Sequence, residues 1–367
     1  QPAGAQRAAA VVGVGLETHI VWVDPATGAL APLSPTSEED RLAELWDWTV
    51  RMTDSGDAVL AAGRSSPQQA WEIWAGRATG EAQVPALRQI TTHQTALAGL
   101  TLGRQEPFTW TAPDGLALDG LLVRPPDAPD DSPLPTVVLV HGGPYGRWEP
   151  GCHLHWFDWA QWLAYAGYAV LMPNIRGGFG HGEPFAAAAR AAVGDADWRD
   201  VLAAVDAAVE RGIADPDRLG IGGWSQGGFM SAWAVTQTRR FKAAVAGAGP
   251  TDWGMMVLTS DMPAFERELG GSAPWDTPEP HGLHHHATLS PITFARNVTT
   301  PVLILHGEKD ERVPLSQATG FHRALREVGV PTEFVFYPRE PHGIRERAHQ
   351  IDLLRRVRSW YDRWLRG

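Results

Sequence analysis

The sequence has a single cysteine, Cys152, among its 367 residues. An internal disulfide is therefore excluded, and the composition fits a reducing compartment. No apolar run reaches the roughly 18 residues that a membrane-spanning helix needs, and the first residues lack the apolar core of a secretory signal. Positive charge is scarce as well, because 31 Lys and Arg against 42 Asp and Glu leave a formal net charge of −11. We therefore expect no general nucleic-acid surface and no binding to an anionic membrane.

Motifs that would hold a cofactor or a metal are missing too. The sequence contains neither a glycine-rich dinucleotide fingerprint nor a phosphate-binding loop. Histidines cluster in the loop 281–287, and imidazoles can bind transition metals. No cysteine or regularly spaced carboxylate accompanies them, so this signal for a metal is weak. We expect the protein to work without a metal or a cofactor.

What the sequence does contain begins with a segment, residues 1–105, that has the texture of an all-β domain. Short apolar runs alternate with turn signals, which indicates strands separated by tight turns. The strands are expected at residues 19–23, 46–52, 58–63 and 70–76.

This segment holds a faint internal repeat. The stretch IVWVDPATG matches EIWAGRATG at an offset of 52 residues, which aligns Trp22 with Trp74 and Gly28 with Gly80. A period of about 40 to 50 residues with strand-turn-strand content is typical of β-propeller blades, with chance similarity of two hairpins as the alternative. Two blades alone leave strand edges uncovered, because a propeller needs at least about four. We therefore expect a partial β-propeller, its last blades, and a missing N-terminal segment that belongs to the same gene product or to an associated fragment.

Residues 106–367 have a different texture, in which apolar strands alternate with amphipathic helices. After a hairpin at 115–127, strands are expected at 135–143, 168–174, 218–223, 241–249, 301–307 and 332–338. Helices are expected at 155–167, 197–212, 226–237 and 348–365, of which the first two end at glycine. Such alternation predicts an α/β domain with a parallel sheet covered by helices, which explains the unbroken apolar strands.

The segment GWSQG, residues 223–227, follows one expected strand and precedes a helix. It fits the G-x-S-x-G nucleophile elbow of the α/β-hydrolase fold, in which a sharp turn projects the serine above the sheet. The two glycines let strand and helix approach closely, and the helix N-terminus favours negative charge near Ser225. A glycine-rich turn with a capping serine is the alternative. The context predicts an α/β-hydrolase catalytic domain with Ser225 as its nucleophile.

A serine hydroxyl needs a base, and the base needs an orienting acid. In this fold the acid and then the histidine follow the serine along the chain. Asp310 lies just beyond the strand PVLILHG, with Glu308 and Glu311 as nearby competitors, and His342 lies in the loop after the next strand. Taken singly, Asp310 could be a solvated loop carboxylate or a helix cap, and His342 could be a surface histidine. Their order and strand-end positions together predict a triad with Ser225.

The third requirement is an oxyanion hole. One N–H is expected from Gln226, the residue after the nucleophile, and the second from the loop HGGPYG, where we favour Gly143. One such donor is typically worth about 3 kcal/mol of transition-state stabilisation. His141 and Tyr145 are candidates for side-chain contacts with the substrate, although packing within the loop is the favoured interpretation of both.

These stretches resemble the prolyl oligopeptidase family of serine peptidases, and within it the acylaminoacyl-peptidase and dipeptidyl-aminopeptidase branch. The matching motifs, in the family's order, are HGGPYG, PNIRGGFGHG, GGWSQGGFM, SPITFARNVTTPVLILHGEKDERVP and EPHGI. The resemblance implies that Ser225, Asp310 and His342 form the triad, and that the N–H groups of Gly143 and Gln226 bind the oxyanion. It also implies an N-terminal β-propeller that restricts entry to short or unfolded peptides.

The resemblance also bears on substrate binding. In some members a tyrosine at the position of His141 donates to the oxyanion, so the histidine here implies a hole built from backbone alone. Arg312 looks like a position that could touch a substrate carbonyl or carboxylate, with a surface ion pair as the favoured alternative. Trp224 and Trp253 are candidates for lining the pocket of the residue before the cleaved bond, with core packing as the equal alternative.

We therefore expect a serine exopeptidase (an aminopeptidase, dipeptidyl-peptidase or acylaminoacyl-peptidase) that hydrolyses short peptides or small amides near the N-terminus through an acyl-enzyme. A carboxylesterase or lipase on the same fold is the alternative, and a non-catalytic binding module is a third hypothesis, against which an intact triad argues. The expected partners are a short peptide or amide substrate and the missing propeller segment, with no nucleic acid and no membrane. A homo-oligomer is compatible with the sequence, and a cytoplasmic location fits it best.

Overall fold

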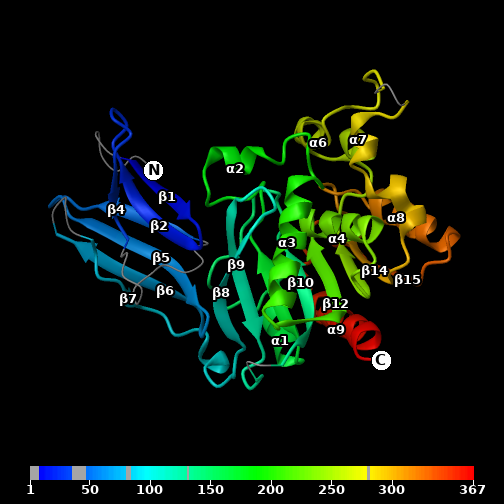
Figure 1. Cartoon of the computed structure of the whole chain (residues 1–367). Coiled ribbons are helices and arrows are strands. Elements are labelled where there is room, and N and C mark those ends of the chain that lie inside the picture. The colour runs from blue at the N-terminus through cyan, green and yellow to red at the C-terminus, as the bar shows by residue number, and fades with distance from the viewer. Residues whose placement is uncertain (1–7, 35–46, 80–83, 130–131, 279–281) are drawn as a thin grey trace. The chain divides into compact units, whose positions relative to one another are not determined.

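The computed structural model describes residues 8–34, 47–79, 84–129, 132–278 and 282–367 (Figure 1). The chain divides into two compact units. The smaller holds Gln1–Gln105 with Glu149–His153, and the larger holds Glu106–Trp148 with Leu154–Gly367. The start of the chain at residues 1–7, Trp46 of one expected strand, Gly80 of the repeat and His281 of the histidine cluster lie outside the described residues.

The smaller unit contains two antiparallel sheets. One consists of β1 (Ala8–Val14), β2 (Glu17–Val23) and β3 (Leu30–Pro32), and the other of β4 (Trp48–Met52), β5 (Ala58–Ser66), β6 (Gln69–Ala78) and β7 (Arg88–Gln89). The turn after β2 is held by Asp24, whose side chain accepts from the N–H of Ala26 and whose carbonyl accepts from the N–H of Gly28. Trp22 lies on β2 and Trp74 on β6, and each of these strands pairs with a neighbour on both sides. The aligned tryptophans therefore both lie on inner strands of their sheets.

The larger unit is built on an eight-stranded sheet in the order β15-β14-β13-β12-β10-β11-β9-β8. The strands are β8 (Arg104–Thr111), β9 (Ala117–Arg124), β10 (Leu134–Val140), β11 (Ala169–Pro173), β12 (Ala214–Trp224), β13 (Ala243–Gly247), β14 (Val302–Gly307) and β15 (Thr332–Tyr337). The strands from β11 to β15 in this order pair in parallel, but β9 is antiparallel to β11. The expectation of a parallel sheet was therefore wrong at this edge, and the expected hairpin at 115–127 is the single strand β9.

Helices cover both faces of this sheet (Figure 1). α1 (Ala160–Tyr165) and α9 (Arg347–Leu365) contact each other on one face, while α3 (Ala196–Glu210), α4 (Gln226–Gln237) and α8 (Ser316–Glu327) lie on the other. The other described helices are α2 (Glu183–Ala187), α5 (Trp253–Thr259), α6 (Pro263–Gly270), α7 (His285–Thr288) and the 3-10 helices η1 (Thr95–Leu97) and η2 (Pro291–Asn297). The helix expected at 155–167 begins only at Ala160, since the preceding residues form a turn in which the Trp159 indole donates to the Trp156 carbonyl.

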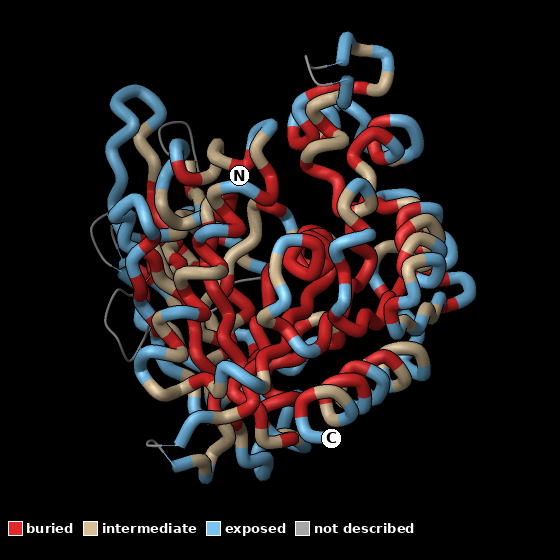
Figure 2. Tube along the Cα trace, turned by 45° about the vertical axis from the view of Figure 1, so that its right-hand side comes forward, coloured by how far each residue is buried: buried red, intermediate tan, exposed pale blue. Residues whose placement is uncertain are grey.

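The central strand β12 is covered on both sides, which accounts for its unbroken apolar sequence. A Cβ placed on Gly220 or Gly222 would lie 2.8 Å or 2.4 Å from atoms of Tyr361, so this side of the strand touches α9 directly. Ile221 belongs to the main hydrophobic core together with Phe229 of α4. In Figure 2 the buried residues gather in β12 and the strands beside it and in α4. Within the described ranges, no helix is both long and apolar enough to cross a membrane.

Candidate active site

Ser225 lies at a strained corner between β12 and α4. Its backbone has φ 61° and ψ −120°, in the half of conformational space that residues with a side chain rarely adopt. Such a conformation costs on the order of 1–3 kcal/mol and persists only where the surroundings enforce it. Here the Ser225 N–H donates to the Gly247 carbonyl of β13 over 2.8 Å, and its own carbonyl accepts from the Phe229 N–H in the first turn of α4.

Two glycines make this corner sterically feasible. A Cβ on Gly223 would lie 2.4 Å from the carbonyl oxygen of Val140, and a Cβ on Gly227 would lie 2.1 Å from the same oxygen. Both distances are far below van der Waals contact, so a side chain at Gly223 would push β12, and one at Gly227 would push α4, away from β10. The close approach inferred from the GWSQG pattern is therefore a property of the structure.

The strand-end loops bring His342 and Asp310 together. His342 Nδ1 lies 2.7 Å from Asp310 Oδ2, and the Asp310 side chain has no exposed surface whereas that of His342 is 28% exposed. The other oxygen of Asp310, Oδ1, accepts from the N–H of Val313 over 2.9 Å. Of the competing carboxylates, Glu308 accepts instead from the N–H of Arg339. Because Nδ1 is held by the carboxylate, Nε2 is the nitrogen of His342 that remains for chemistry.

Trp224 links the serine corner to the histidine loop. Its indole N–H donates to the carbonyl of His342 over 2.9 Å, and the ring packs edge-on against Trp156 with 4.8 Å between ring centroids. Trp224 is buried and directly precedes Ser225 along the chain. The residues flanking Ser225 and those carrying His342 are therefore side by side.

The loop His141–Gly146 lies against the same corner. A Cβ on Gly142 would lie 3.5 Å from the Cβ of Ser225, so the loop passes directly beside the serine. Gly143 has φ 128°, a conformation open to glycine. Gln226 is the first residue of α4, and its N–H has no carbonyl partner within the helix because it belongs to the first turn.

The His141 side chain is buried beneath this loop. Its Nδ1 lies 2.9 Å from the Gly142 carbonyl, which can only accept, so Nδ1 carries the hydrogen. Burial lowers the pKa of His141 to about 4, which leaves the ring neutral at physiological pH. A neutral ring with its hydrogen on Nδ1 has no N–H at Nε2, and this side chain therefore cannot donate to an oxyanion from Nε2.

The three remaining residues singled out from the sequence have different surroundings. Tyr145 is partly exposed and stacks on Phe179, with 5.7 Å between ring centroids. Trp253 opens α5 and is fully buried, where it packs edge-on against Phe229. Arg312 forms an ion pair in which its Nε lies 2.7 Å from Asp261 Oδ1.

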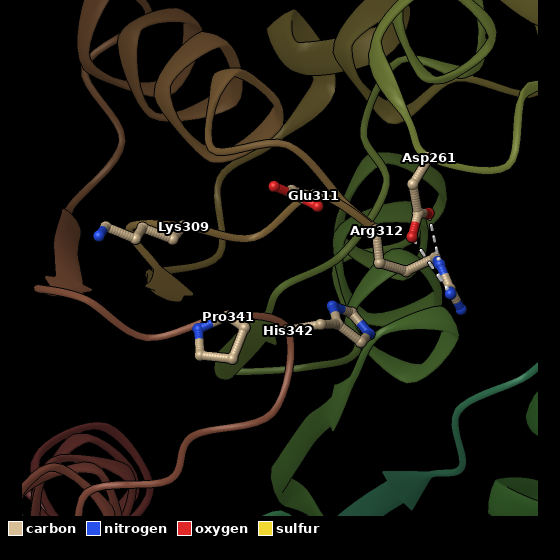
Figure 3. A pocket seen from close by; sticks show the side chains of 6 residues that line it. All are labelled: Asp261, Lys309, Glu311, Arg312, Pro341 and His342. Carbon is tan, nitrogen blue, oxygen red and sulfur yellow. Dashed lines mark hydrogen bonds and ion pairs between the residues drawn. The ribbon is translucent and has the colours of Figure 1, made fainter.

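An open pocket lies beside His342 (Figure 3). It has a volume of about 350 Å³ and is lined by Asp261, Lys309, Glu311, Arg312, Pro341 and His342. In Figure 3 the bonded side chains of Asp261 and Arg312 stand on the side of the pocket where His342 projects. The pocket therefore offers charges of both signs next to the imidazole.

Two acidic residues near this pocket, Asp261 and Glu266, were not predicted from the sequence. The Arg312 guanidinium holds the pKa of the Asp261 carboxyl below its usual range. Glu266 on α6 is buried next to Ser260, and burial raises its pKa to about 7. Neither carboxylate belongs to a recognisable motif, because its partners lie far away in the sequence or on an unpredicted helix.

Among the described residues, Glu340, Glu346 and His349 form a cluster with metal-ligand spacing. Its atoms are already engaged, however. The Glu340 carboxylate accepts from the N–H groups of Arg345 and Glu346 and from His349 Nδ1, and Glu346 is paired with Arg339. This cluster therefore fits a structural network better than a metal.

Three histidines of the 281–287 segment are described, and the rings of His284 and His286 stack with 5.0 Å between their centroids, whereas His285 has a separate partner. His285 donates to the Ala191 carbonyl, and His286 Nδ1 is bonded to the Ser272 hydroxyl. These two imidazoles therefore do not converge on a common point.

The sequence matches the family model described as the prolyl oligopeptidase family over residues 155–367. It is 36% identical over 277 residues to the uncharacterized peptidase YuxL of Bacillus subtilis, and 32% identical over 237 residues to the acylamino-acid-releasing enzyme of Arabidopsis thaliana. These alignments cover 72% and 63% of this chain but only 40% and 30% of the two relatives. A puromycin-hydrolyzing peptidase of Mycobacterium tuberculosis superposes with a TM-score of 0.79 and 26% identity, over 98% of this chain and 52% of that one.

The chain thus spans less than half the length of these curated relatives and about half of the solved structure. Its mixed eight-stranded sheet, the helices on both faces and the serine corner after β12 are those of the α/β-hydrolase fold. The family model covers more than half of the residues, which confirms the resemblance seen in the motifs. The chain belongs to the prolyl oligopeptidase family of serine peptidases.

Proposed function

We propose that this chain carries the active site of a serine exopeptidase that cleaves short peptides or small amides near their N-terminus. The observation that carries the proposal is the 2.7 Å contact between His342 Nδ1 and the buried carboxylate of Asp310. The loop that holds His342 accepts a hydrogen bond from Trp224, the residue before Ser225, which supports the proposal that Ser225 and His342 act in one site.

In the proposed mechanism, Asp310 holds the hydrogen of His342 on Nδ1 and so leaves Nε2 free to act as a base. Nε2 takes the proton of Ser225 as Oγ attacks the substrate carbonyl, and the carbonyl electron pair moves to its oxygen. The N–H groups of Gly143 and Gln226 stabilise this oxyanion. The electron pair of the oxyanion then re-forms the carbonyl, the carbon–nitrogen bond breaks, and His342 gives the proton to the leaving amine; water hydrolyses the acyl-enzyme by the same steps.

Arg312 is proposed to bind a carbonyl of the substrate rather than a carboxylate. Its charge is already balanced by Asp261, but that ion pair lies on a partly exposed surface and leaves N–H donors of the guanidinium free to turn toward the pocket. A neutral acceptor needs one such donor and no uncompensated charge. Tyr145 is proposed as an apolar contact, because its ring is partly exposed two residues beyond Gly143.

Amides are proposed as substrates in preference to esters because two of these relatives are named peptidases and the third is named an acylamino-acid-releasing enzyme. The smaller unit is proposed to form the last blades of a β-propeller. β4 to β7 would make one four-stranded blade, and β1 to β3 three strands of the blade before it. The remaining blades would come from a segment that precedes this chain, and they would limit access to short peptides.

The experiment that tests this function compares peptide anilides, with free and acylated N-termini, with simple nitrophenyl esters. Each rate is measured for the parent chain and for Ser225→Ala. Anilide hydrolysis that disappears in Ser225→Ala supports the peptidase. Turnover of esters alone would favour an esterase, and no Ser225-dependent turnover of any substrate would refute the proposal.

A further inference from the structure

His306 lies on β14, four positions before Asp310, and its side chain has no exposed surface. Its Nε2 lies 2.7 Å from the carbonyl oxygen of Val313 and 3.5 Å from Oδ2 of Asp310. A carbonyl oxygen only accepts hydrogen bonds, so Nε2 carries the hydrogen and donates it to Val313.

The other ring nitrogen of His306, Nδ1, is in a different situation. Burial lowers the pKa of His306, so the ring is neutral and its Nδ1 bears no hydrogen. Nδ1 is buried and finds no hydrogen-bond partner within the described part of the chain. An unpaired buried polar atom costs free energy, which an apolar side chain at this position would avoid. A histidine here is therefore explained by the bond that its Nε2 donates, not by packing.

That bond is the first of three that lead to the catalytic histidine. The Val313 carbonyl accepts from His306, and the Val313 N–H donates to Asp310 Oδ1 over 2.9 Å. Asp310 Oδ2 in turn lies 2.7 Å from His342 Nδ1. Both polar groups of the Val313 backbone are thus fixed, and a rotation of the Asp310 carboxylate would break the bond to Val313.

We propose that His306 is a positioning residue for the reaction proposed above, since its N–H fixes Val313 and Val313 fixes the carboxylate of Asp310 toward His342. The inference rests on the proposed function for its catalytic consequence. The arrangement of Asp310 and His342 can nevertheless be measured without any substrate.

The test compares two substitutions that differ in one property. His306→Leu fills similar space without a donor, whereas His306→Gln retains an N–H that can reach the Val313 carbonyl. His322→Leu is the control, because His322 belongs to the same unit, is half-buried and packs against Phe334, with 5.5 Å between ring centroids. If His306→Leu yields no folded protein, His306→Asn replaces it, since asparagine keeps the donor but is too short to reach.

The first readout is the downfield proton resonance of His342 Nδ1–H, identified by its loss in His342→Ala. We expect it to persist in His306→Gln and His322→Leu, and to disappear or shift in His306→Leu or His306→Asn. An unchanged resonance in the variant that lacks the bond to the Val313 carbonyl, His306→Leu or its replacement His306→Asn, would overturn the proposal. Because no substrate is involved, this readout stands even if the parent chain hydrolyses nothing, in which case only the proposed function fails.

The second readout is kcat per folded molecule on a peptide anilide. We expect a loss of about 10- to 100-fold in His306→Leu, with KM unchanged within about twofold, and recovery to within about threefold of the parent in His306→Gln. A purely structural role would lower the amount of folded protein and leave kcat per folded molecule unchanged, which would contradict a positioning role. Equal impairment of the glutamine and leucine variants would contradict it too.

Discussion

Asp310→Asn is the substitution whose effect the structure specifies most fully. The carboxylate accepts from two N–H groups, that of Val313 at 2.9 Å from Oδ1 and that of His342 at 2.7 Å from Oδ2. An asparagine side chain keeps the shape but has one accepting oxygen and one donating amide. One of the two N–H groups must therefore lose its acceptor.

The burial of Val313 decides which group loses it. Val313 is 2% exposed, and an unpaired buried N–H costs about 1–3 kcal/mol. The imidazole of His342, by contrast, can change its tautomer and accept at Nδ1. We expect the asparagine oxygen to stay with Val313 and its amide to face His342. The ring then carries its hydrogen on Nε2 and cannot take the proton of Ser225.

In a Ser-His-Asp triad this wrong tautomer lowers kcat by about 10⁴-fold, or about 5 kcal/mol of transition-state stabilisation. The assay is kcat on a peptide anilide, per folded molecule as judged by circular dichroism. Glu308→Gln is the control, because a glutamine oxygen can still accept from Arg339 N–H, and its kcat should stay within about threefold of the parent. A kcat of Asp310→Asn within about tenfold of the parent would refute the reasoning.

Three further changes test other parts of the structure. Gly227→Ala places a Cβ 2.1 Å from the Val140 carbonyl oxygen, so we expect the free energy of unfolding to fall by about 1–3 kcal/mol or more. The melting temperature should then be lower by several degrees, and an unchanged melting temperature would contradict this. Burial raises the pKa of Asp197 from 3.8 to about 7, so the folded state holds the proton more tightly and loses stability as pH rises through this range. Asp197→Asn should therefore gain up to about 4 kcal/mol on the parent in urea unfolding between pH 4 and pH 8, and a constant difference would refute it. Glu340→Gln leaves one of the N–H groups around Glu340 unpaired and should cost about 1–3 kcal/mol in the same assay, where no change would count against the network.

The pairing of Asp310 with His342 could be expected from the sequence because both follow apolar strands. The carboxyl ends of parallel strands meet at one edge of a sheet, so residues just beyond them converge although 32 positions separate these two. The GWSQG pattern likewise indicates its corner, because its glycines are needed where β12 and α4 approach the Val140 carbonyl of β10.

The direction of β9 and the first residue of α1 could not be predicted from the sequence pattern. An unbroken apolar run indicates a strand that is buried on both faces, but it does not indicate the direction in which the strand pairs. The antiparallel pairing of β9 with β11 could therefore not be predicted from the sequence. The aromatic residues before Ala160 have helical spacing, but Trp156 packs against Trp224 and the chain forms a turn there.

The partners of Arg312 and Val313 could not be predicted from the sequence either. Asp261 meets Arg312 across a separation of 51 residues, and α5 and α6, which flank Asp261, are too short to give a strong periodic signal. His306 looks like one more apolar-strand residue, because its role depends on the Val313 carbonyl and not on any spacing. Contacts of this kind arise from tertiary packing alone.

The central claim is that the Ser225 hydroxyl, activated by His342, is the nucleophile of a hydrolase. The most direct measurement is mass spectrometry of the chain after brief exposure to a fluorophosphonate, with His342→Ala and Ser225→Ala treated alongside. The account predicts a single adduct on Ser225, formed much more slowly in His342→Ala and absent in Ser225→Ala. Labelling at another residue, or equal rates with and without His342, would contradict it.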